Sequence, residues 1–544
     1  MNRRSFLVGT VAGPLAAMYS RGQTGVPEGE SEIGERPNLV FILVDDMGFS
    51  DPGCFGGEIY TPNLDRLARE GIRLTRMHND AMCVASRSAL LSGKWWPRAG
   101  MGIGNGPTLA ERLKQAGYRT GIVGKWHLNG NPIDRGFDSF LGFLGGFANH
   151  FTGHPSYRRN REPFDDFGPD YFSTTAFTDE AIRFIQTSSR EKKGQPFFLY
   201  LAYQAPHNPL QAPREDIMKY RGRYLAGWQA VREARFRRQK ELGVVPADTV
   251  LPPYPENLPP WDALPPEQKD LEDLRMSVYA AMVNGIDRGV GRLMKSLEEA
   301  CCTDNTLVVF CSDNGTDSFH VLDQAMLKRG QLPGDPESNW QPGTGWAYAS
   351  VTPWRLYKIS NHSGGVKTGT IAWWPKGISL PGRVEDCPLH FVDIAPTFLS
   401  LAGASMPEGN ALAGQSFGSL FGGVSFQRKC PIYSQFADNR ALRTENWTLV
   451  EVDGAGWELF RSRDITECND LASEQPQVVR DLEELWLQWW RAESGQSSYT
   501  PKSTADSQHY QPQGDRGSGM IYRPTAMPVE LKGRYPIPRD RSPG

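Results

Sequence analysis

The sequence has no long hydrophobic run, no excess of charge of one sign and no internal repeat. Its 544 residues include 59 Lys and Arg against 62 Asp and Glu, a formal net charge of −3. That balance argues against a nucleic-acid-binding protein held by a basic surface. No stretch reaches the roughly 18 consecutive apolar residues that a membrane-spanning helix needs, and no self-similarity occurs at the spacing of solenoids or propellers. We therefore expect a globular chain without a membrane span or a nucleic-acid partner.

The eight cysteines contain no Cys-x-x-Cys pair, which argues against a thiolate zinc site. The sequence does not fix any disulfide pairing among them. Aromatic residues are plentiful, with 15 Trp, 18 Tyr and 26 Phe, and this core material excludes a disordered chain. The 57 Gly and 41 Pro follow no fixed period, so a loop-rich globular fold is expected rather than a collagen-like one.

Changes in composition divide the chain into four parts. Arg3-Arg4 precedes a short, weakly apolar run, which resembles a twin-arginine export signal, although a basic start can also arise by chance. We expect residues 1–35 to be an export signal and leader that direct the protein to the periplasm. Residues 36–429 would form the main domain, with a charged and Pro-rich surface insertion at about 214–270. Residues 430–495 would form a small α+β domain, and 496–544 an extended tail.

Apolar strands alternate with amphipathic helices through the main domain. The run 38–44 is continuously apolar, which is typical of a strand buried on both faces. Further strands are predicted at 120–123, 196–203 and 306–312, and helices at 61–71, 108–113 and 272–300. Thr108 and Glu111 predict a capping box at the start of the second helix. This pattern predicts an α/β fold with a large, mostly parallel mixed sheet between helices. After residue 430, four short strands and a helix near 476–492 predict a small antiparallel-sheet domain.

Carboxylate and amide side chains follow two of the predicted strands directly. Asp45-Asp46 ends the first strand and Asp313-Asn314 ends a later one. Adjacent carboxylates repel unless a cation offsets their charge, and oxygen ligands of this kind suit Ca²⁺ or Mg²⁺. Solvated turns are the alternative for each pair alone. In open α/β sheets, sites form beyond the carboxyl ends of the strands, so the two pairs together predict a metal site there.

Other candidate functional residues lie near predicted strand or helix ends. Cys83 and Arg87 are four residues apart and share a helix face, which indicates either a buried cysteine or a low-pKa thiol. Lys125 and His127 are two residues apart, on one side of an extended segment. His207 lies between two prolines after a strand.

A further lysine, Lys358, ends the segment Trp-Arg-Leu-Tyr-Lys and precedes Gly364-Gly365. With the residues above, it belongs to an ordered set of motifs: PNLVFILVDDMGFSD (37–51), TPNLDRLAREG (61–71), CVASR and LLSGK (83–94), GYRTGIVGKWHL (117–128), APHNPLQAP (205–213), SDNG (312–315) and RLYKISNHSGG (355–365). Over residues 36–490 the chain resembles a type I sulfatase of the alkaline-phosphatase-like superfamily, and most resembles the bacterial arylsulfatases.

The resemblance implies a modified nucleophile and a metal. Cys83 would be oxidised to Cα-formylglycine by a formylglycine-generating or sulfatase-maturating enzyme. Ala85 stands where many members of the family have Pro, and Ser363 stands where the family often has Glu before two glycines. Asp45 and Asp46 would bind Ca²⁺, or Mg²⁺, and the remaining metal ligands would be Asp313, Asn314 and the modified Cys83.

The resemblance also implies a role for each catalytic side chain. Arg87, with Lys125 beside it, would hold the hydrated nucleophile, and His127 would be the base that releases sulfate. His207 and Lys358 would contact the sulfate and protonate the leaving oxygen. Three Asp, one divalent metal and three basic residues give a formal charge of about +2, which suits a monoanionic sulfate ester.

Two alternative functions and an open substrate remain. One alternative is a phosphomonoester or phosphonate hydrolase on the same fold, although such enzymes more typically use Thr or Ser where this chain has Cys83. The other is a non-catalytic binder of sulfated glycans, if Cys83 stays unconverted. Aryl sulfates, alkyl sulfates and sulfated sugars are all candidate substrates, and His150, His154 and aromatic residues of the loop 316–350 are candidate pocket residues.

Overall fold

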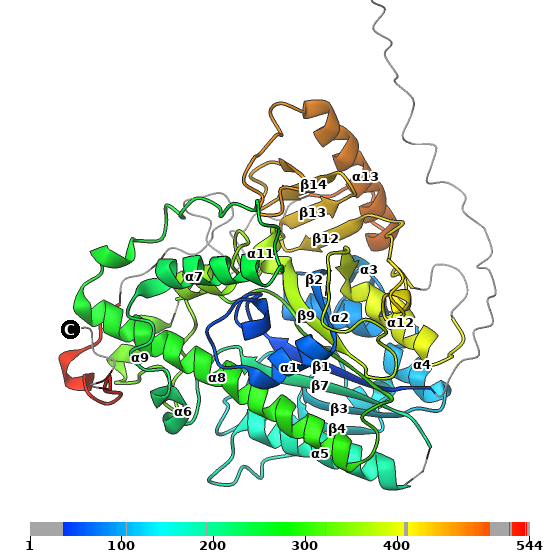
Figure 1. Cartoon of the computed structure of the whole chain (residues 1–544), viewed down its shortest axis with the longest axis horizontal. Helices are drawn as coiled ribbons and strands as arrows, with labels where there is room; N and C mark the ends of the chain where they lie inside the picture. The colour runs from blue at the N-terminus through cyan, green and yellow to red at the C-terminus, as the bar shows by residue number, and fades with distance from the viewer. Residues whose placement is uncertain are drawn as a thin grey trace, which may run out of the picture. The chain divides into compact units, whose positions relative to one another are not determined.

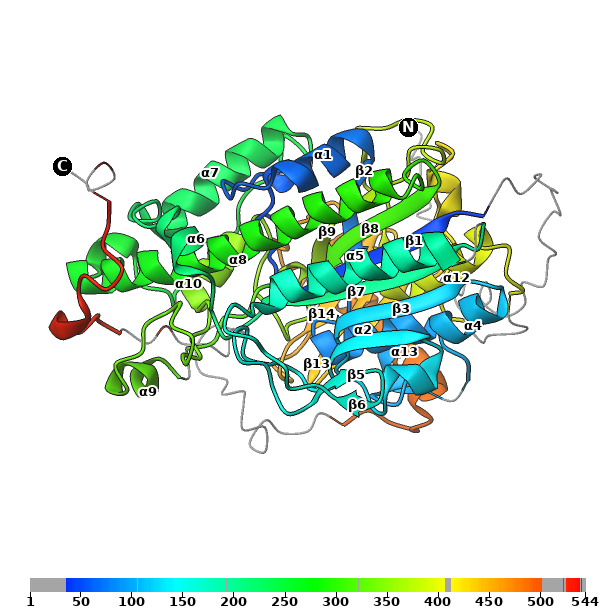
Figure 2. The same ribbon diagram turned by 90° about the horizontal axis from the view of Figure 1, so that it is seen from below.

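The fold is built on one large sheet whose central strands are parallel, as the computed structural model in Figures 1 and 2 shows. Five strands run parallel in the order β8, β1, β7, β3, β4. They span Thr306–Ser312 (β8), Asn38–Asp45 (β1), Phe197–Pro206 (β7), Arg119–Lys125 (β3) and Ser139–Phe143 (β4). Every residue of β7 and β8 is buried, which explains why these strands lack an alternating pattern.

Antiparallel strands extend this sheet on both sides. Beyond β8 lie β9 (Lys367–Trp373) and β2 (Ile72–His78), each antiparallel to its neighbour. The short strands β10 (Val384–Glu385) and β11 (Leu389–His390) pair with β2, while β5 (Tyr157–Arg159) and β6 (Glu162–Pro163) follow β4 at the other edge. The predicted mixed α/β sheet is confirmed.

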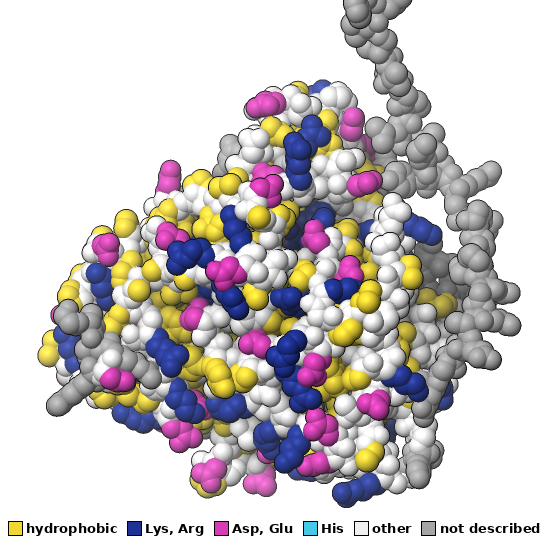
Figure 3. All heavy atoms as spheres, in the orientation of Figure 1, with side chains coloured by type: hydrophobic (Ala, Val, Ile, Leu, Met, Phe, Trp, Pro, Cys, Tyr) yellow, Lys and Arg dark blue, Asp and Glu magenta, His cyan; other side chains and the backbone are white. Residues whose placement is uncertain are grey.

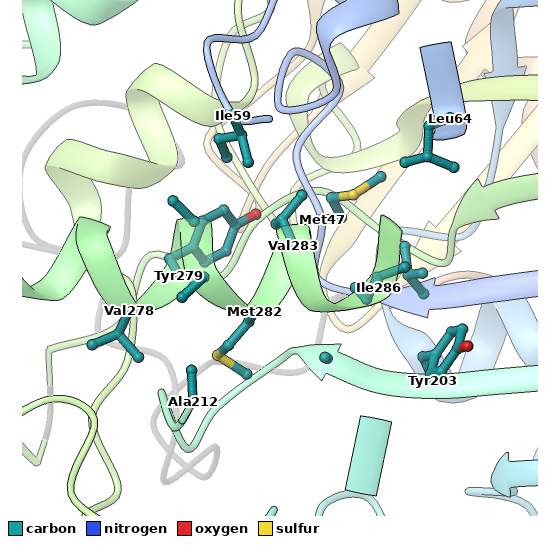
Figure 4. Close-up of a cluster of buried hydrophobic side chains, with 14 of the residues drawn as sticks. Met47, Ile59, Leu64, Tyr203, Ala212, Val278, Tyr279, Met282, Val283 and Ile286 are labelled. Carbon is teal, nitrogen blue, oxygen red and sulfur yellow. The ribbon is translucent and has the colours of Figure 1, made fainter. Parts of the chain in front are cut away.

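Helices cover both faces of the sheet. Alternate side chains of β1 point to opposite faces and belong to two different hydrophobic clusters. Val40, Ile42 and Val44 belong to one hydrophobic cluster, whereas Leu39, Phe41 and Leu43 belong to a second. The first cluster includes side chains of α1 (Pro62–Glu70), α5 (Ser173–Glu191) and α8 (Pro266–Glu299). Figure 4 shows side chains of α8 next to Tyr203 of β7 and next to the segment that follows β1.

The second cluster covers the opposite face of the sheet with α2 (Cys83–Ser92), α4 (Leu109–Gln115) and α12 (Ile394–Leu401). Helix α4 begins with the predicted capping box, in which Thr108 and Glu111 each bond the other's backbone N–H. The sheet is therefore buried on both sides, and its polar residues can gather only at the strand ends.

The segment 214–270 packs into the domain more closely than its charged sequence indicated. It contains α6 (Arg214–Met218) and α7 (Gly227–Glu241). Trp228, Arg232, Arg235 and Gln239 of α7 are buried. One face of this helix therefore packs on the core, while the other face, with Gln229, Glu233 and Arg237, is exposed. The loop 316–350 likewise contains two short helices, α9 (Asp323–Lys328) and α10 (Thr344–Ser350).

A second sheet of four antiparallel strands follows, as predicted. It consists of β12 (Ile432–Phe436), β13 (Asn439–Arg443), β14 (Trp447–Glu451) and β15 (Glu458–Arg461). The helix α13 (Pro476–Ser494) follows these strands in the chain. Figure 1 shows it beside β2 and α3 (Trp96–Ala99). Chain contacts place the residues that the structure describes from 36 onwards in one compact unit. In the tail, Tyr522, Met527 and Tyr535 are buried against the first hydrophobic cluster, so part of it packs on the domain.

The structure describes residues 36–104, 106–191, 194–320, 322–406, 412–500, 522, 525–538 and 540. The predicted export signal and leader, residues 1–35, lie outside this range. No helix of the described residues is long and apolar enough to cross a membrane. On the face shown in Figure 3, basic and acidic side chains are interspersed.

Candidate active site

The predicted site residues meet at one edge of the large sheet. Asp45 ends β1 and Asp46 follows it, Asp313 and Asn314 follow β8, and Lys125 ends β3. Because these strands and β7 are parallel neighbours, their carboxyl ends open at the same edge. His207 follows β7 at this edge, and Lys358 reaches it from the loop before β9. All of these side chains are buried.

The acidic residues form a candidate metal site. Ligand atoms of Asp45, Cys83 and Asp313 lie within 4.8 Å of one another, and so do those of Asp45, Asp46 and His207. Asp45 Oδ1 and Asn314 Oδ1 are buried without a hydrogen-bond partner. Buried oxygens of native proteins are rarely left unpaired, and oxygens of this kind are the ligands that hard divalent cations prefer. The residues present therefore fit a divalent metal.

Cys83 is the first residue of α2, and its side chain is buried between the acidic residues and Arg87. Arg87, one turn later, donates from Nε and Nη2 to Asp313 Oδ2 at 3.0 and 2.7 Å. Its Nη1 donates to the carbonyl of Lys125 at 3.1 Å and to Tyr200 Oη at 3.3 Å. Burial raises the pKa of the Cys83 thiol, which contradicts the alternative of a low-pKa thiol.

Two lysines lie directly against the carboxylates. Lys125 Nζ donates to Asp45 Oδ2 at 2.5 Å, and Lys358 Nζ donates to both oxygens of Asp46 at 2.7 and 2.9 Å. His207 Nε2 lies 3.6 Å from Asp46 Oδ2, and its Nδ1 bonds the carbonyl of Asn208 at 2.7 Å. The three acidic side chains are thus matched by three basic ones before any cation is added.

Burial and neighbouring charges shift the ionisation of these groups. Burial opposes ionisation of Asp45, but Lys125 and its other basic neighbours outweigh it and hold the pKa of Asp45 below its usual range. Burial and the nearby Asp45 raise the pKa of Asp313 to about 7. The pKa of Lys358 lies above its usual range, because Asp46 outweighs burial. A divalent cation beside Asp313, in addition to the Arg87 guanidinium, would lower the pKa of Asp313 and favour its ionised form.

His127 is placed differently from the prediction. Its backbone has φ 59°, in the left-handed region, so Lys125 and His127 do not share one side of an extended strand. Burial, followed by the charges of Lys125 and Arg87, lowers the pKa of His127 to about 2. Its Nδ1 is buried without a hydrogen-bond partner. The imidazole is therefore neutral and has an unpaired nitrogen, but it is a weak base unless a nearby negative charge raises its pKa.

His150 is buried and His154 is exposed, so these two predicted pocket residues lie in different surroundings. His150 is buried, with Nδ1 2.7 Å from Ser173 Oγ and Nε2 3.3 Å from the carbonyl of His207. It therefore supports the backbone of His207. His154 is exposed and bonds Ser156.

The sequence motifs did not reveal a buried network that holds the loop after Asp46. Asp51 accepts hydrogen bonds from Gly48 N at 2.8 Å, Tyr279 Oη at 2.6 Å and Arg235 Nη1 at 2.6 Å. Tyr279 also lies 3.2 Å from the carbonyl of Asp46. Asp51 closes the DDMGFSD motif, which was the only sequence signal for this network.

A second network joins the small sheet to the site. Glu467 accepts hydrogen bonds from Ser363 N and Oγ at 3.1 and 2.7 Å, and its Oε2 lies 2.8 Å from His362 Nδ1. The carbonyl of Gly365 in this turn accepts from Gly315 N at 2.9 Å, next to Asn314. A carboxylate from a distant segment thus contacts the turn in which Ser363 replaces the glutamate expected from the family.

The sulfatase family model matches residues 37–404, which contain the whole strand-end site. The chain belongs to the sulfatase family. It is 34% identical over 529 residues to an uncharacterised sulfatase of Schizosaccharomyces pombe, covering 85% of this chain and 94% of that protein. It is 35% identical over 410 residues to the arylsulfatase of Klebsiella aerogenes, covering 68% and 87%.

Solved structures with a similar fold are consistent with the assignment of this chain to the sulfatase family. The crystal structure of i-CgsB in complex with a neocarrahexaose has a TM-score of 0.62 and 26% identity, covering 86% of this chain and 96% of that one. A sulfatase of Pseudoalteromonas, 22% identical with a TM-score of 0.57 and covering 86% and 92%, supports the fold alone. The protein is a sulfuric ester hydrolase with the alkaline-phosphatase-like fold, and its family implies a metal and a formylglycine.

Proposed function

We propose that Cys83 is converted to formylglycine and acts as the nucleophile of an arylsulfatase-type reaction. The observation that carries this proposal is that Cys83 Sγ lies within 4.8 Å of carboxylate oxygens of Asp45 and Asp313. A nucleophile at that position would share its surroundings with a cation held by the same carboxylates. We further propose that this cation is Ca²⁺, held by Asp45, Asp46, Asp313 and Asn314, because all four offer hard oxygen ligands.

When present, the cation would draw negative charge from the sulfuryl group, and the hydrated formylglycine would supply a hydroxyl for attack and a second one for sulfate release. Arg87 is fixed by Asp313 and by two further hydrogen bonds, so its guanidinium orients the group at position 83. Lys125 and Lys358 contribute positive charge where the ester oxygens become more negative.

Two histidines would divide the proton transfers. His127 is neutral, because burial and nearby positive charges lower its pKa to about 2. It would accept the proton that accompanies sulfate release once the negative charge of the bound sulfate raises that pKa. His207 faces Asp46 with Nε2, because its Nδ1 donates to the carbonyl of Asn208. Burial lowers the pKa of His207 to about 4, so its Nε2 carries a proton to donate only when Asp46 and the bound sulfate ester together favour the charged form. His207 and Lys358 would contact the sulfate and protonate the leaving oxygen.

The proposed substrates are aryl sulfates or related sulfate monoesters, supported by the 35% identity with the Klebsiella aerogenes arylsulfatase. We also propose that a formylglycine-generating or sulfatase-maturating enzyme acts on the chain. The Arg3-Arg4 segment supports export to the periplasm through a twin-arginine signal.

Mass spectrometry of the tryptic peptide that ends at Arg87 tests the central proposal. Formylglycine makes the peptide about 18 Da lighter than cysteine does. The control is the tryptic peptide 296–328, whose three cysteines, Cys301, Cys302 and Cys311, should stay unconverted. Turnover of an aryl sulfate and of the matching aryl phosphate is measured on the same sample. Unmodified Cys83 in an inactive protein would favour the glycan-binder alternative, and preference for the phosphate would favour the phosphatase alternative.

A further inference from the structure

A small cavity lies between the large sheet and the small sheet, and it shares no lining residue with the catalytic site. Its volume is about 20 Å³. Three basic side chains line it: Arg76 from β2, Lys367 from β9 and Arg443 from β13. Two carboxylates, Asp464 and Glu467, also reach its wall. The cavity is therefore a meeting point of charges from both sheets.

Two of the basic side chains are buried without adequate partners. Lys367 is 6% exposed, and its ammonium lies 4.1 Å from the ring centroid of Trp354. Among the described residues, no hydrogen-bond acceptor or carboxylate oxygen pairs with this ammonium. Arg443 is 8% exposed and donates from Nη2 to the carbonyl of Asn361 at 2.5 Å, while its Nη1 is buried with no partner. Buried cations of this kind need a counter-charge.

The carboxylates at the cavity are already engaged elsewhere. Glu467 is bonded by His362 and Ser363 and reaches Arg443 only at 3.6 Å. Asp464 accepts the backbone N–H groups of Cys468 and Asn469 at 2.8–3.2 Å. Arg76 lies 3.8 Å from the exposed Asp386. Glu467 is thus shared by Arg443 and His362. The cavity wall carries three Lys or Arg side chains against two carboxylates, which leaves positive charge in excess.

We propose that this cavity binds a monovalent anion of the size of chloride, between the Lys367 ammonium and Arg443 Nη1. A volume of about 20 Å³ exceeds the roughly 10–15 Å³ that one water requires, so the cavity can hold a monatomic anion. A water would satisfy the unpaired N–H groups but would leave the positive charge uncompensated. The bound anion joins β9 of the large sheet to β13 of the small one.

Burial, and then the charge of Arg76, lowers the pKa of Lys367 to about 7. An anion at contact distance would favour the charged lysine and oppose this shift. Occupancy of the site should therefore stabilise the folded protein in proportion to the logarithm of chloride concentration above the dissociation constant.

The test compares the thermal midpoint of the metal-loaded protein in sodium chloride and in sodium gluconate, at equal ionic strength and pH. Gluconate is too large for the cavity, so we expect the midpoint to rise with the logarithm of chloride concentration above the dissociation constant and to stay constant in gluconate. Lys367→Met should remove this dependence, whereas Lys295→Met, at an exposed position of α8, should keep it. Crystals soaked in bromide should show an anomalous peak between Lys367 and Arg443.

Equal midpoints in chloride and gluconate, or no bromide peak at this position, would show that the cavity holds only water and would overturn the proposal. If Lys367→Met does not fold, the comparison of salts on the unchanged protein and the bromide peak still decide the question. A chloride effect that persists unchanged in a folded Lys367→Met variant would place the responsible anion elsewhere.

Discussion

Substitution of Arg235 by Met would remove the cation that α7 places against the loop after Asp46. Arg235 Nη1 donates to Asp51 Oδ1 at 2.6 Å, and its Nε donates to Glu58 at 2.7 Å. Asp51 is fully buried, whereas the side chain of Glu58 is 40% exposed. The variant therefore leaves one carboxylate buried without a counter-charge. The loss of the pair with the exposed Glu58 should add less than about 1 kcal/mol.

Protonation of Asp51 sets an upper limit on the cost. Burial already raises the pKa of Asp51, and removal of Arg235 raises it further. An acid whose pKa is higher in the folded state destabilises the fold above its unfolded pKa, and the penalty vanishes as the pH falls to that value. With about 1.4 kcal/mol per pH unit and an unfolded pKa of about 3.9, the limit is about 4 kcal/mol at pH 7 and about 1.5 kcal/mol at pH 5.

Thermal unfolding at pH 5, 6 and 7 measures this effect. An unfolding entropy of about 2 cal/mol/K per residue over about 500 residues makes 1 kcal/mol equivalent to about 1 °C. The part of the midpoint difference that comes from Asp51 should therefore be at most about 4 °C at pH 7 and at most about 1.5 °C at pH 5, and it should shrink as the pH falls. Arg232→Met is the matched control, because Arg232 lies one turn away and donates to the carbonyls of Tyr348, Pro353 and Trp354.

Carbonyls do not titrate, so the Arg232→Met difference should be independent of pH. A difference for Arg235→Met that stays constant or grows from pH 7 to pH 5 would refute the reasoning, because it would show that Asp51 is not the source of the penalty.

Three further predictions concern the site itself. A strong chelator should lower both turnover and thermal midpoint, and addition of Ca²⁺ should restore them. Asp313→Ala should weaken metal binding in a dye-competition titration. An unchanged affinity for the metal would remove Asp313 from the ligand set. His127→Ala should release about one leaving group per site in a rapid phase and then turn over very slowly. His207→Ala should instead slow the first phase, most of all for alkyl sulfates with poor leaving groups. Equal loss of rate in both phases for His127→Ala would contradict this division of roles. Glu467→Gln should weaken metal binding, because Glu467 fixes the turn that bonds Gly315 beside Asn314; an unchanged metal dissociation constant would confine Glu467 to a role within the small sheet.

The sequence predicted the fold wherever local pattern and burial agreed. The apolar run 38–44 became β1, and Thr108 and Glu111 form the expected capping box. The acidic pairs after β1 and β8 come together because parallel strands end at one edge, which follows from the topology rather than from the spacing of the residues.

Contacts between distant side chains could not be predicted in the same way. Arg235 lies in a charged segment that reads as a solvated helix, and its partner Asp51 is 184 residues away. His127 was expected on an extended segment, but its left-handed backbone redirects the side chain. Glu467 gave no signal at all, since the turn that it contacts is more than 100 residues earlier in the sequence.

The burial of Cys83 places a limit on when the chain can be modified. Its side chain is 1% exposed, and the strand that brings Asp313 beside it follows about 230 residues later in the sequence. At about 5–20 residues per second, a ribosome needs roughly 10–50 s to synthesise that interval. If a maturation enzyme converts Cys83, it must reach the residue while β1 still lacks β8 as its neighbour, so the rate of synthesis and folding would set the fraction of molecules that become active.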